Sequence, residues 1–141
     1  MISFREKRIF ICKEIAASPE AVWDILTDIR LWPMWGPSLV AVDCEESHIK
    51  LGSKGRVKTL FSFWLPFTIS KFRDLEFWSW RIGSFEATGH TLIQTGNHSC
   101  KLCFDMPWWA AAYLPVCWFA LVKIARIAPF NYLAPVPPVD F

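Results

Sequence analysis

Hydrophobic and polar positions follow three successive patterns along this 141-residue chain. Residues 4–14 alternate around a β-branched and aromatic centre, which predicts a first strand. A stripe at helical spacing follows and predicts a helix over 19–28. This stripe consists of Val22, Ile25, Leu26 and Ile29. Ser18 is a favoured N-cap, and Pro19 suits the first helical position, so the helix is expected to begin there.

From residue 39 to residue 104 the pattern is mostly alternating and predicts strands. The expected strands are 39–45, 56–63, 67–75, 76–82, 85–95 and 97–104. Turns are expected at Gly52-Ser53, Leu65-Pro66 and Gly96-Asn97. The apolar run of 107–128 predicts a long final helix, which Pro115 would kink or restart. Many strands, with helices only near the start and the end, indicate an α+β fold with one antiparallel sheet.

Length and composition favour a single domain over 1–128, followed by a Pro-rich tail at 129–141 that is expected to be extended or disordered. The chain is 53% hydrophobic and carries nine Trp and twelve Phe, more large rings than a small core requires. These rings either fill the interior or line an apolar pocket. The net charge of +2 lacks the clustered basic stripe of a nucleic-acid-binding face, so no nucleic-acid partner is expected.

Several short motifs occur in a characteristic order. They are Ser-Pro-Glu-Ala-Val-Trp at 18–23, Trp-Pro-Met-Trp at 32–35, Gly-Ser-Lys-Gly at 52–55, Pro-Phe-Thr-Ile at 66–69, Trp-Ser-Trp at 78–80 and Thr-Gly-His-Thr at 88–91. Over roughly 4–128 the chain resembles the START and polyketide cyclase/dehydratase-like (SRPBCC) superfamily. The resemblance implies a helix-grip fold, in which six or seven antiparallel strands curve around the C-terminal helix. It also implies a cavity that binds lipids, polyketides or aromatic-like molecules, and in some members catalyses cyclisation or dehydration.

Strand parity, taken with this resemblance, gives the candidate site residues. The expected lining consists of Thr59, Phe61, Trp78, Trp80, His90, Leu92, Cys100, Leu102 and Phe104. The facing of the strand 67–75 is ambiguous. Lys71 and Arg73 indicate one solvent face, which would turn Thr68, Ser70, Phe72 and Asp74 inward.

His90 is the candidate catalytic residue, because a pocket imidazole can act as a general acid or base near neutral pH. A histidine whose hydrogen bonds are satisfied within the core is the competing interpretation. The sequence therefore predicts a domain that binds a small hydrophobic molecule. A cyclase or dehydratase acting through His90 is the alternative, and a structural or partner-binding module using the Trp108-Trp109 edge and the tail is the second one.

No metal site or cofactor is expected, because the three histidines show no ligand spacing and no Gly-rich phosphate loop is present. Five cysteines cannot all pair internally, and Cys100 and Cys103 would point to opposite faces of a strand. Charges at 5–8 interrupt any signal peptide, so a reduced, cytoplasmic setting is expected. The uncharged run 106–122 is expected to be a buried helix, although a peripheral membrane contact through Trp108 and Trp109 remains open. The oligomeric state is not predicted.

Overall fold

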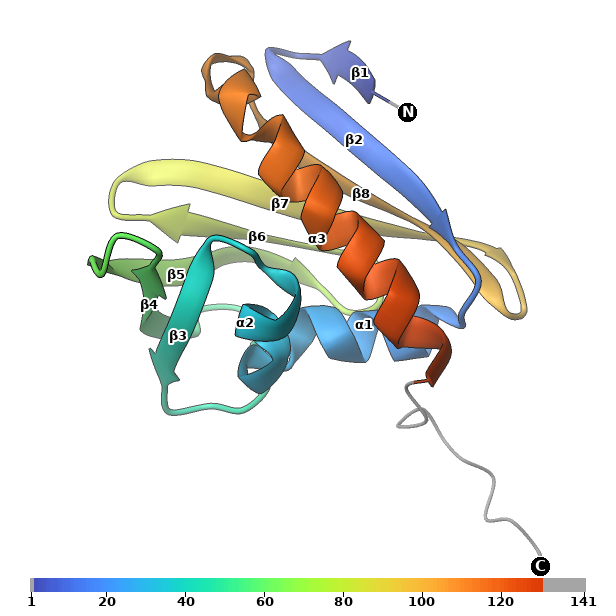
Figure 1. Ribbon diagram of the computed structural model, residues 1–141, viewed down its shortest axis with the longest axis horizontal. Coiled ribbons are helices and arrows are strands. Elements are labelled where there is room, and N and C mark those ends of the chain that lie inside the picture. The colour runs from blue at the N-terminus through green and yellow to red at the C-terminus, as the bar shows by residue number, and fades with distance from the viewer. Residues whose placement is uncertain (1, 131–141) are drawn as a thin grey trace, which may run out of the picture.

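The computed structural model describes residues 2–130, and these form one antiparallel sheet that curves behind a long C-terminal helix (Figure 1). The strands are β1 (Ile2–Arg5), β2 (Arg8–Ile15), β3 (Leu39–Cys44), β4 (Lys54–Thr59), β5 (Trp64–Arg73), β6 (Phe77–Ile82), β7 (Phe85–Gly96) and β8 (Ser99–Pro107). Their order in the sheet is β1-β2-β8-β7-β6-β5-β4-β3. The expected tail at 129–141 lies almost wholly outside the described residues.

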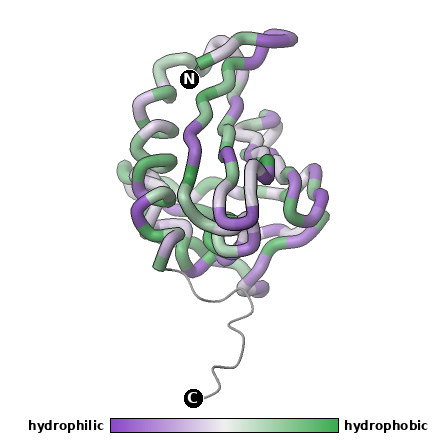
Figure 2. The backbone as a smooth tube through the Cα atoms, turned by 90° about the vertical axis from the view of Figure 1, so that its right-hand side faces the viewer, coloured by the Kyte–Doolittle hydropathy of each residue, from purple (hydrophilic) through white to green (hydrophobic). Residues whose placement is uncertain are grey.

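The helices lie between β2 and β3 and after β8, as the sequence predicts. They are α1 (Pro19–Thr27), η1 (Ile29–Leu31), α2 (Trp32–Trp35), η2 (Trp108–Tyr113), α3 (Leu114–Ile127) and η3 (Ala128–Phe130). The final helical region changes from 3₁₀ to α at Leu114, and Pro115 occupies the first turn of α3. The expected restart at Pro115 is thus confirmed. In Figure 2, α3 carries mainly hydrophobic colouring, whereas several turns at the edge of the sheet are hydrophilic.

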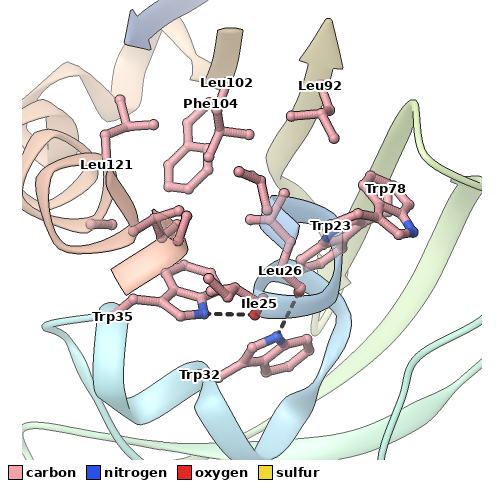
Figure 3. Close-up of a cluster of buried hydrophobic side chains, with 14 of the residues drawn as sticks. Trp23, Ile25, Leu26, Trp32, Trp35, Trp78, Leu92, Leu102, Phe104 and Leu121 are labelled. Carbon is pink, nitrogen blue, oxygen red and sulfur yellow. Dashed lines mark hydrogen bonds between the residues drawn. The ribbon is translucent and has the colours of Figure 1, made fainter. Parts of the chain in front are cut away.

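Helix α1 begins as the sequence predicts, and its end is satisfied in a way that the sequence did not reveal. Ser18 Oγ accepts a hydrogen bond from Ala21 N at 3.2 Å. At the other end, the indole nitrogens of Trp32 and Trp35 donate to Leu26 O and Ile25 O, at 2.9 and 3.0 Å (Figure 3). Carbonyls in the last turn of a helix have no partner within the helix. The Trp-Pro-Met-Trp motif therefore closes α1 by hydrogen bonding, in addition to filling the core.

Two turns differ from the sequence-based expectation. The first strand is split at Glu6 and Lys7, whose φ angles of 52° and 64° form a tight reversal. This split supplies the eighth strand, where six or seven were expected. The expected turn at Leu65-Pro66 is also wrong: Pro66 lies inside β5, and the chain reverses at Leu60–Phe63, where Ser62 has a φ of 66°.

The expected facing of β5 holds at Lys71, Phe72 and Arg73 but is wrong at Thr68 and Ser70, before the register shift. Phe67 and Ile69 are buried in the core, whereas Ser70 donates a hydrogen bond to Glu86, a residue paired with Arg81. A register shift between Ile69 and Lys71 in the pairing with β6 breaks the simple alternation. A bulge of this kind changes which face later residues occupy, so parity counted back from Lys71 gives the wrong face for Thr68 and Ser70.

The Gly-Ser-Lys-Gly motif has two separate backbone roles. Gly52 has a φ of +86°, a conformation that residues with a Cβ rarely adopt. Gly55 has an ordinary φ, but a Cβ there would lie 2.5 Å from Asp43 O on the neighbouring strand β3. The first glycine therefore allows the turn, and the second allows β3 and β4 to approach closely.

Candidate functional site

Two adjoining cavities lie between the sheet and the helical regions. The larger has a volume of about 540 Å³, and the smaller about 50 Å³. Five residues line both cavities, namely Ser38, Leu39, Trp80, Thr88 and Tyr113. The smaller cavity is therefore a narrow inward extension of the larger one.

The larger cavity is built from the ends of elements that are distant in sequence. Its walls come from the end of β4 and the turn after it, from β6, from the start of β7, from the end of β8 and from η2. The lining is almost entirely apolar. Trp80 closes its inner end, where the indole ring packs against Trp32 and Phe67 at centroid distances of 5.3 and 5.7 Å. This geometry suits a small apolar molecule, since ligand pockets of this size are typically lined by hydrophobic groups with few polar ones.

The nine predicted lining residues separate into three groups. Thr59, Phe61 and Trp80 line the large cavity. Trp78, Trp80, His90 and Phe104 line the small one, so Trp80 belongs to both. Leu92, Cys100 and Leu102 are at most 5% exposed and border neither cavity. Phe61 reaches the cavity from the β4–β5 turn and is 82% exposed, because it lies outside the strand to which the sequence assigned it.

His90 lies in a column of stacked rings. Its ring is 3.8 Å from that of Trp78, and Trp78 in turn stacks on Trp32 at 5.5 Å. Nδ1 lies 3.2 Å from Trp78 O, and since a carbonyl can only accept, Nδ1 carries the proton of the neutral ring. Burial lowers the pKa of His90 to about 3, although the hydrogen bond to Trp78 O opposes this shift. The imidazole is therefore uncharged at neutral pH.

The polar groups of the large cavity are few and mostly engaged. Ser38 Oγ and Tyr113 Oη form a hydrogen bond of 2.5 Å. Glu86 is the one charged residue that the described part of the chain places in the lining, and it accepts hydrogen bonds from Ser70 and Arg81 at 3.0 and 3.1 Å. Burial alone would raise the pKa of Glu86, but these donors lower it, so the carboxylate stays ionised and paired.

Three buried polar atoms make no hydrogen bond to any group within residues 2–130. They are Thr59 Oγ1, Trp78 Nε1 and Trp80 Nε1. Buried polar atoms without a partner are uncommon in folded proteins. All three residues line one of the two cavities, so the cavity walls retain unmet hydrogen-bonding capacity.

The cysteines follow the facing expected from strand parity, but not the reduced state expected of them. Cys12 and Cys103 lie directly opposite each other on β2 and β8 and form a disulfide. Cys100 points into the core, where burial raises the pKa of its thiol to about 11; burial likewise raises the pKa of Cys117 to about 12. Neither buried thiol is a nucleophile at neutral pH, because the reactive form is the thiolate.

A cluster of groups that can bind metals lies away from the cavities. One ligand atom each of Asp24, Asp28 and His48 lies within 4.8 Å of the others. Arg30 already donates to Asp28 at 2.7 Å, and His48 Nε2 lies 3.0 Å from Asp24 Oδ1. Burial alone would raise the pKa of Asp28, but the hydrogen bonds from Arg30 lower it. The cluster is accounted for as an ion-pair network at the end of α1.

Sequence reasoning missed the outer half of the cavity. Parity along strands identifies residues that alternate, but Leu60 and Phe63 lie in a turn and Trp109 in η2, and Phe85 is the first residue of β7. The available signal was the cluster of large rings at 61–64, which strand parity divided between two faces.

The apolar stretch Trp108–Phe130 is long enough to cross a membrane by length and composition, and only 22% of its most apolar window is buried. The expectation of a mostly buried helix thus holds for one face of α3 only.

Solved structures share this fold at low sequence identity. XoxI from Bacillus cereus matches with a TM-score of 0.68 and 14% identity, over 86% of this chain and 95% of its own. A START superfamily protein from Mycobacterium smegmatis matches with a TM-score of 0.63 and 14% identity, over 85% and 98%. A protein from Arthrobacter aurescens matches with a TM-score of 0.67 and 12% identity, over 100% and 98%. At these identities the likeness establishes the fold alone.

No curated protein matches the chain. Residues 1–119 match the family described as polyketide cyclase / dehydrase and lipid transport, which covers the sheet, the early helices and the start of α3. The antiparallel sheet closed by a long C-terminal helix is the architecture expected of that family. The chain therefore belongs to the polyketide cyclase/dehydrase and lipid transport family, of the SRPBCC type.

Proposed function

We propose that this protein reversibly binds a neutral, mostly apolar small molecule, such as a lipid, a polyketide or an aromatic compound, in its large cavity. The observation that carries the proposal is the 540 Å³ cavity with its almost wholly apolar lining. Family and fold point in the same direction, towards a START-like domain for hydrophobic ligands. A cavity of this volume falls within the usual size range of small-molecule sites, about 300–1,000 Å³.

The charges around the cavity favour an uncharged ligand. Among residues 2–130, no Lys, Arg or His lines the large cavity, so an acidic headgroup buried there would meet no counter-charge from them. Glu86 is ionised and already held by Arg81 and Ser70, which further disfavours an anion. Burying an unpaired charge costs far more than the burial of a ligand's apolar surface returns. The polar groups left to orient a neutral ligand are the Ser38–Tyr113 pair, Thr88, Thr59 Oγ1 and Trp80 Nε1, the last two having no partner within residues 2–130.

We assign direct ligand contact to Thr59, Phe61 and Trp80, because these predicted residues line the large cavity. Trp78, His90 and Phe104 form a second layer around the small cavity. Replacing Trp80 with Ala should weaken ligand binding more than it alters the secondary structure. Unchanged affinity in that variant would remove Trp80 from the site.

The proposal is tested with two Thr→Trp variants on β7. One places the new ring in the cavity, and the other places it on the opposite face of the strand. Thr88 lines both cavities, whereas Thr91 lies on the same strand and borders neither of them. Native mass spectrometry of protein purified without detergent should show a non-covalent adduct, which denaturation removes. Nile red, a neutral apolar dye, should bind and gain fluorescence. Thr88→Trp should abolish both signals and Thr91→Trp should keep them; equal behaviour of the two variants would refute the proposal.

The cyclase or dehydratase alternative depends on His90, and no specific observation favours it. The ring does not line the large cavity, and its Nδ1 proton is directed at Trp78 O. A pKa lowered to about 3 leaves a poor base near neutral pH. If the alternative held, His90→Ala would abolish turnover of a polyketide-like substrate while the dye still bound.

Domain extent, location and partners complete the proposal. We take residues 1–128 as one ligand-binding domain, placed in the cytoplasm, with a peripheral membrane contact through Trp108 and Trp109. Both rings are well exposed, at 55% and 60%. Labelling of free thiols in intact cells tests the location: a reduced compartment should leave Cys12 and Cys103 free to react, and an oxidising one should keep them joined as in the structure.

A further inference from the structure

The entrance of the large cavity is bordered by apolar side chains that face outward. Seven large side chains both line the cavity and are exposed. One of them, Tyr113, is hydrogen-bonded to Ser38. We call the other six, which are wholly apolar or aromatic, the rim: Leu60, Phe61, Phe63, Leu65, Phe85 and Trp109. Phe61 is 82% exposed and Phe63 is 66% exposed. Single exposed apolar residues are ordinary on a soluble protein, but a contiguous group of large ones marks an interaction surface.

The rim is assembled from three separate segments at one edge of the molecule. These segments are the β4–β5 turn with the start of β5, the first residue of β7, and η2. The ends of β5 and β7 lie at the left of Figure 1, and η2 precedes α3 at the top. The rings of Phe85 and Trp109 meet at 5.9 Å, which joins two of the segments. Trp108 continues the apolar surface beside Trp109 without lining the cavity.

Cationic side chains flank the rim. The Arg56 guanidinium lies 4.5 Å from the centre of the Trp64 ring, and Lys58 Nζ lies 6.0 Å from it. Neither Arg56 nor Lys58 lines the cavity, so both face the outer surface. Arg56 is also paired with Asp43 at 3.0 Å, whereas Lys58 forms no ion pair within residues 2–130 and is the cation left for an anionic headgroup. Glu86 is the carboxylate in the lining itself, and Arg81 already pairs with it. Basic groups beside exposed Trp and Phe match the headgroup region of an anionic bilayer.

From this arrangement we infer that the rim docks on a lipid bilayer, so that the ligand enters the cavity from the membrane. The inference rests on the proposed function, since it names the source of that ligand. A bilayer covers the rim and also supplies apolar molecules at the entrance, whereas a protein partner seated there would close it. Trp and Phe are well suited to the membrane–water interface, where an aromatic body meets both phases.

The first test is co-sedimentation of the full chain with vesicles of phosphatidylcholine and phosphatidylglycerol in equal parts. Wild-type protein should sediment with them, and less with pure phosphatidylcholine. The double variant Phe61→Ser/Phe63→Ser should bind at least about tenfold more weakly, because two large rings no longer leave water. Phe130→Ser and Leu51→Ser are matched controls, since both side chains are exposed and neither lines the cavity. Equal loss in the controls, or no loss in the double variant, would overturn the inference.

The second test separates docking from ligand binding. Trp108→Ser and Lys58→Glu change the surface beside the rim without altering the cavity lining. Both variants should bind Nile red in vesicle-free solution as wild type does, yet extract it several-fold more slowly from anionic vesicles. If wild type binds the dye but ignores vesicles, docking is wrong and the proposed function stands; if vesicles bind but the dye does not, the proposed function fails. Concentration-dependent dimers that the double rim variant abolishes would assign the rim to a second copy of the chain.

Discussion

The inner and outer halves of the interior use the same residue types in opposite ways. In the inner half, Trp32 is fully buried, donates to Leu26 O, and packs against Phe67, Trp78 and Trp80 at 5.3 to 5.5 Å. In the outer half, the rim surrounds a cavity of about 540 Å³. Both halves belong to one continuous sheet, so the difference lies in what covers the concave face. Helices α1, α2 and α3 cover the inner half, whereas the outer cavity is bordered by η2 and by turns.

The comparison shows that the large number of aromatic residues has two separate explanations. The inner rings fill space and close the end of α1, and their removal should cost stability. The rim rings leave space unfilled and contact water, and their removal should cost function only. Composition alone cannot separate these outcomes, because both halves contribute Trp and Phe to the same total.

The largest expected effect is on stability in the inner half. Trp32→Ala should lower the free energy of unfolding by about 3–5 kcal/mol, because a large cavity opens and Leu26 O loses its donor. Urea denaturation followed by circular dichroism measures this change. Trp109→Ala, at an exposed site, is the matched control and should cost less than about 1 kcal/mol. Similar losses in both variants would erase the distinction between the halves.

The fold was predictable because local signals agreed with one another. Ser18 and Pro19 marked the start of α1, and alternation located six of the eight strands to within a few residues. The errors arose where residues adopt φ angles that are rare for their residue type. Glu6, Lys7 and Ser62 adopt positive φ without being glycine, and such positions leave no compositional signal.

The next largest effect concerns the contribution of the disulfide to the stability of the inner half. The disulfide between Cys12 and Cys103 joins β2 to β8 beside the buried pair Ile11 and Phe104, and it closes a loop with a sequence separation of 91. Replacing both cysteines with Ser should lower stability by about 2–4 kcal/mol, with a limit near 4.7 from chain entropy. Denaturation with and without a reductant checks this. Wild type should lose stability in the reductant, and the variant should not respond to it.

A smaller effect should appear in the pH dependence of stability. The folded-state pKa of His90 is lowered to about 3, whereas the unfolded chain protonates it near 6.5. The unfolded state therefore takes up a proton first as the pH falls, and stability drops from about pH 6.5 downward until pH 3. Between pH 7 and pH 5 this loss amounts to about 2 kcal/mol.

His90→Phe retains a ring in the stack but cannot be protonated, so it provides the matched comparison. Subtracting its stability curve from that of wild type should leave the loss attributable to His90. A difference that is flat between pH 7 and pH 5 would mean that the ring is open to water, as an acid–base catalyst in the large cavity would require.

The site was harder to predict than the fold, for a physical reason. Thr59 and Trp80, which parity assigned to the inner face, line the large cavity. Parity cannot tell which inward-facing positions of a strand border a cavity and which are packed against a helix, because that depends on which helix covers each part of the strand. Leu92, Cys100 and Leu102 face inward at positions that the core fills. Phe85 begins β7 and Trp109 lies in η2, and only the packing of these distant segments brings the two rings together.

The smallest expected effect is also the most informative about the outer half. Phe61→Ser should leave the free energy of unfolding within about 0.5 kcal/mol of wild type, because its ring is 82% exposed and buries little surface on folding. Urea denaturation of this variant beside Trp32→Ala measures it. A loss above about 1 kcal/mol would mean that the rim belongs to the core in solution. If the fold is indifferent to this ring while vesicle binding depends on the rim, the ring's exposure is explained by function and not by folding.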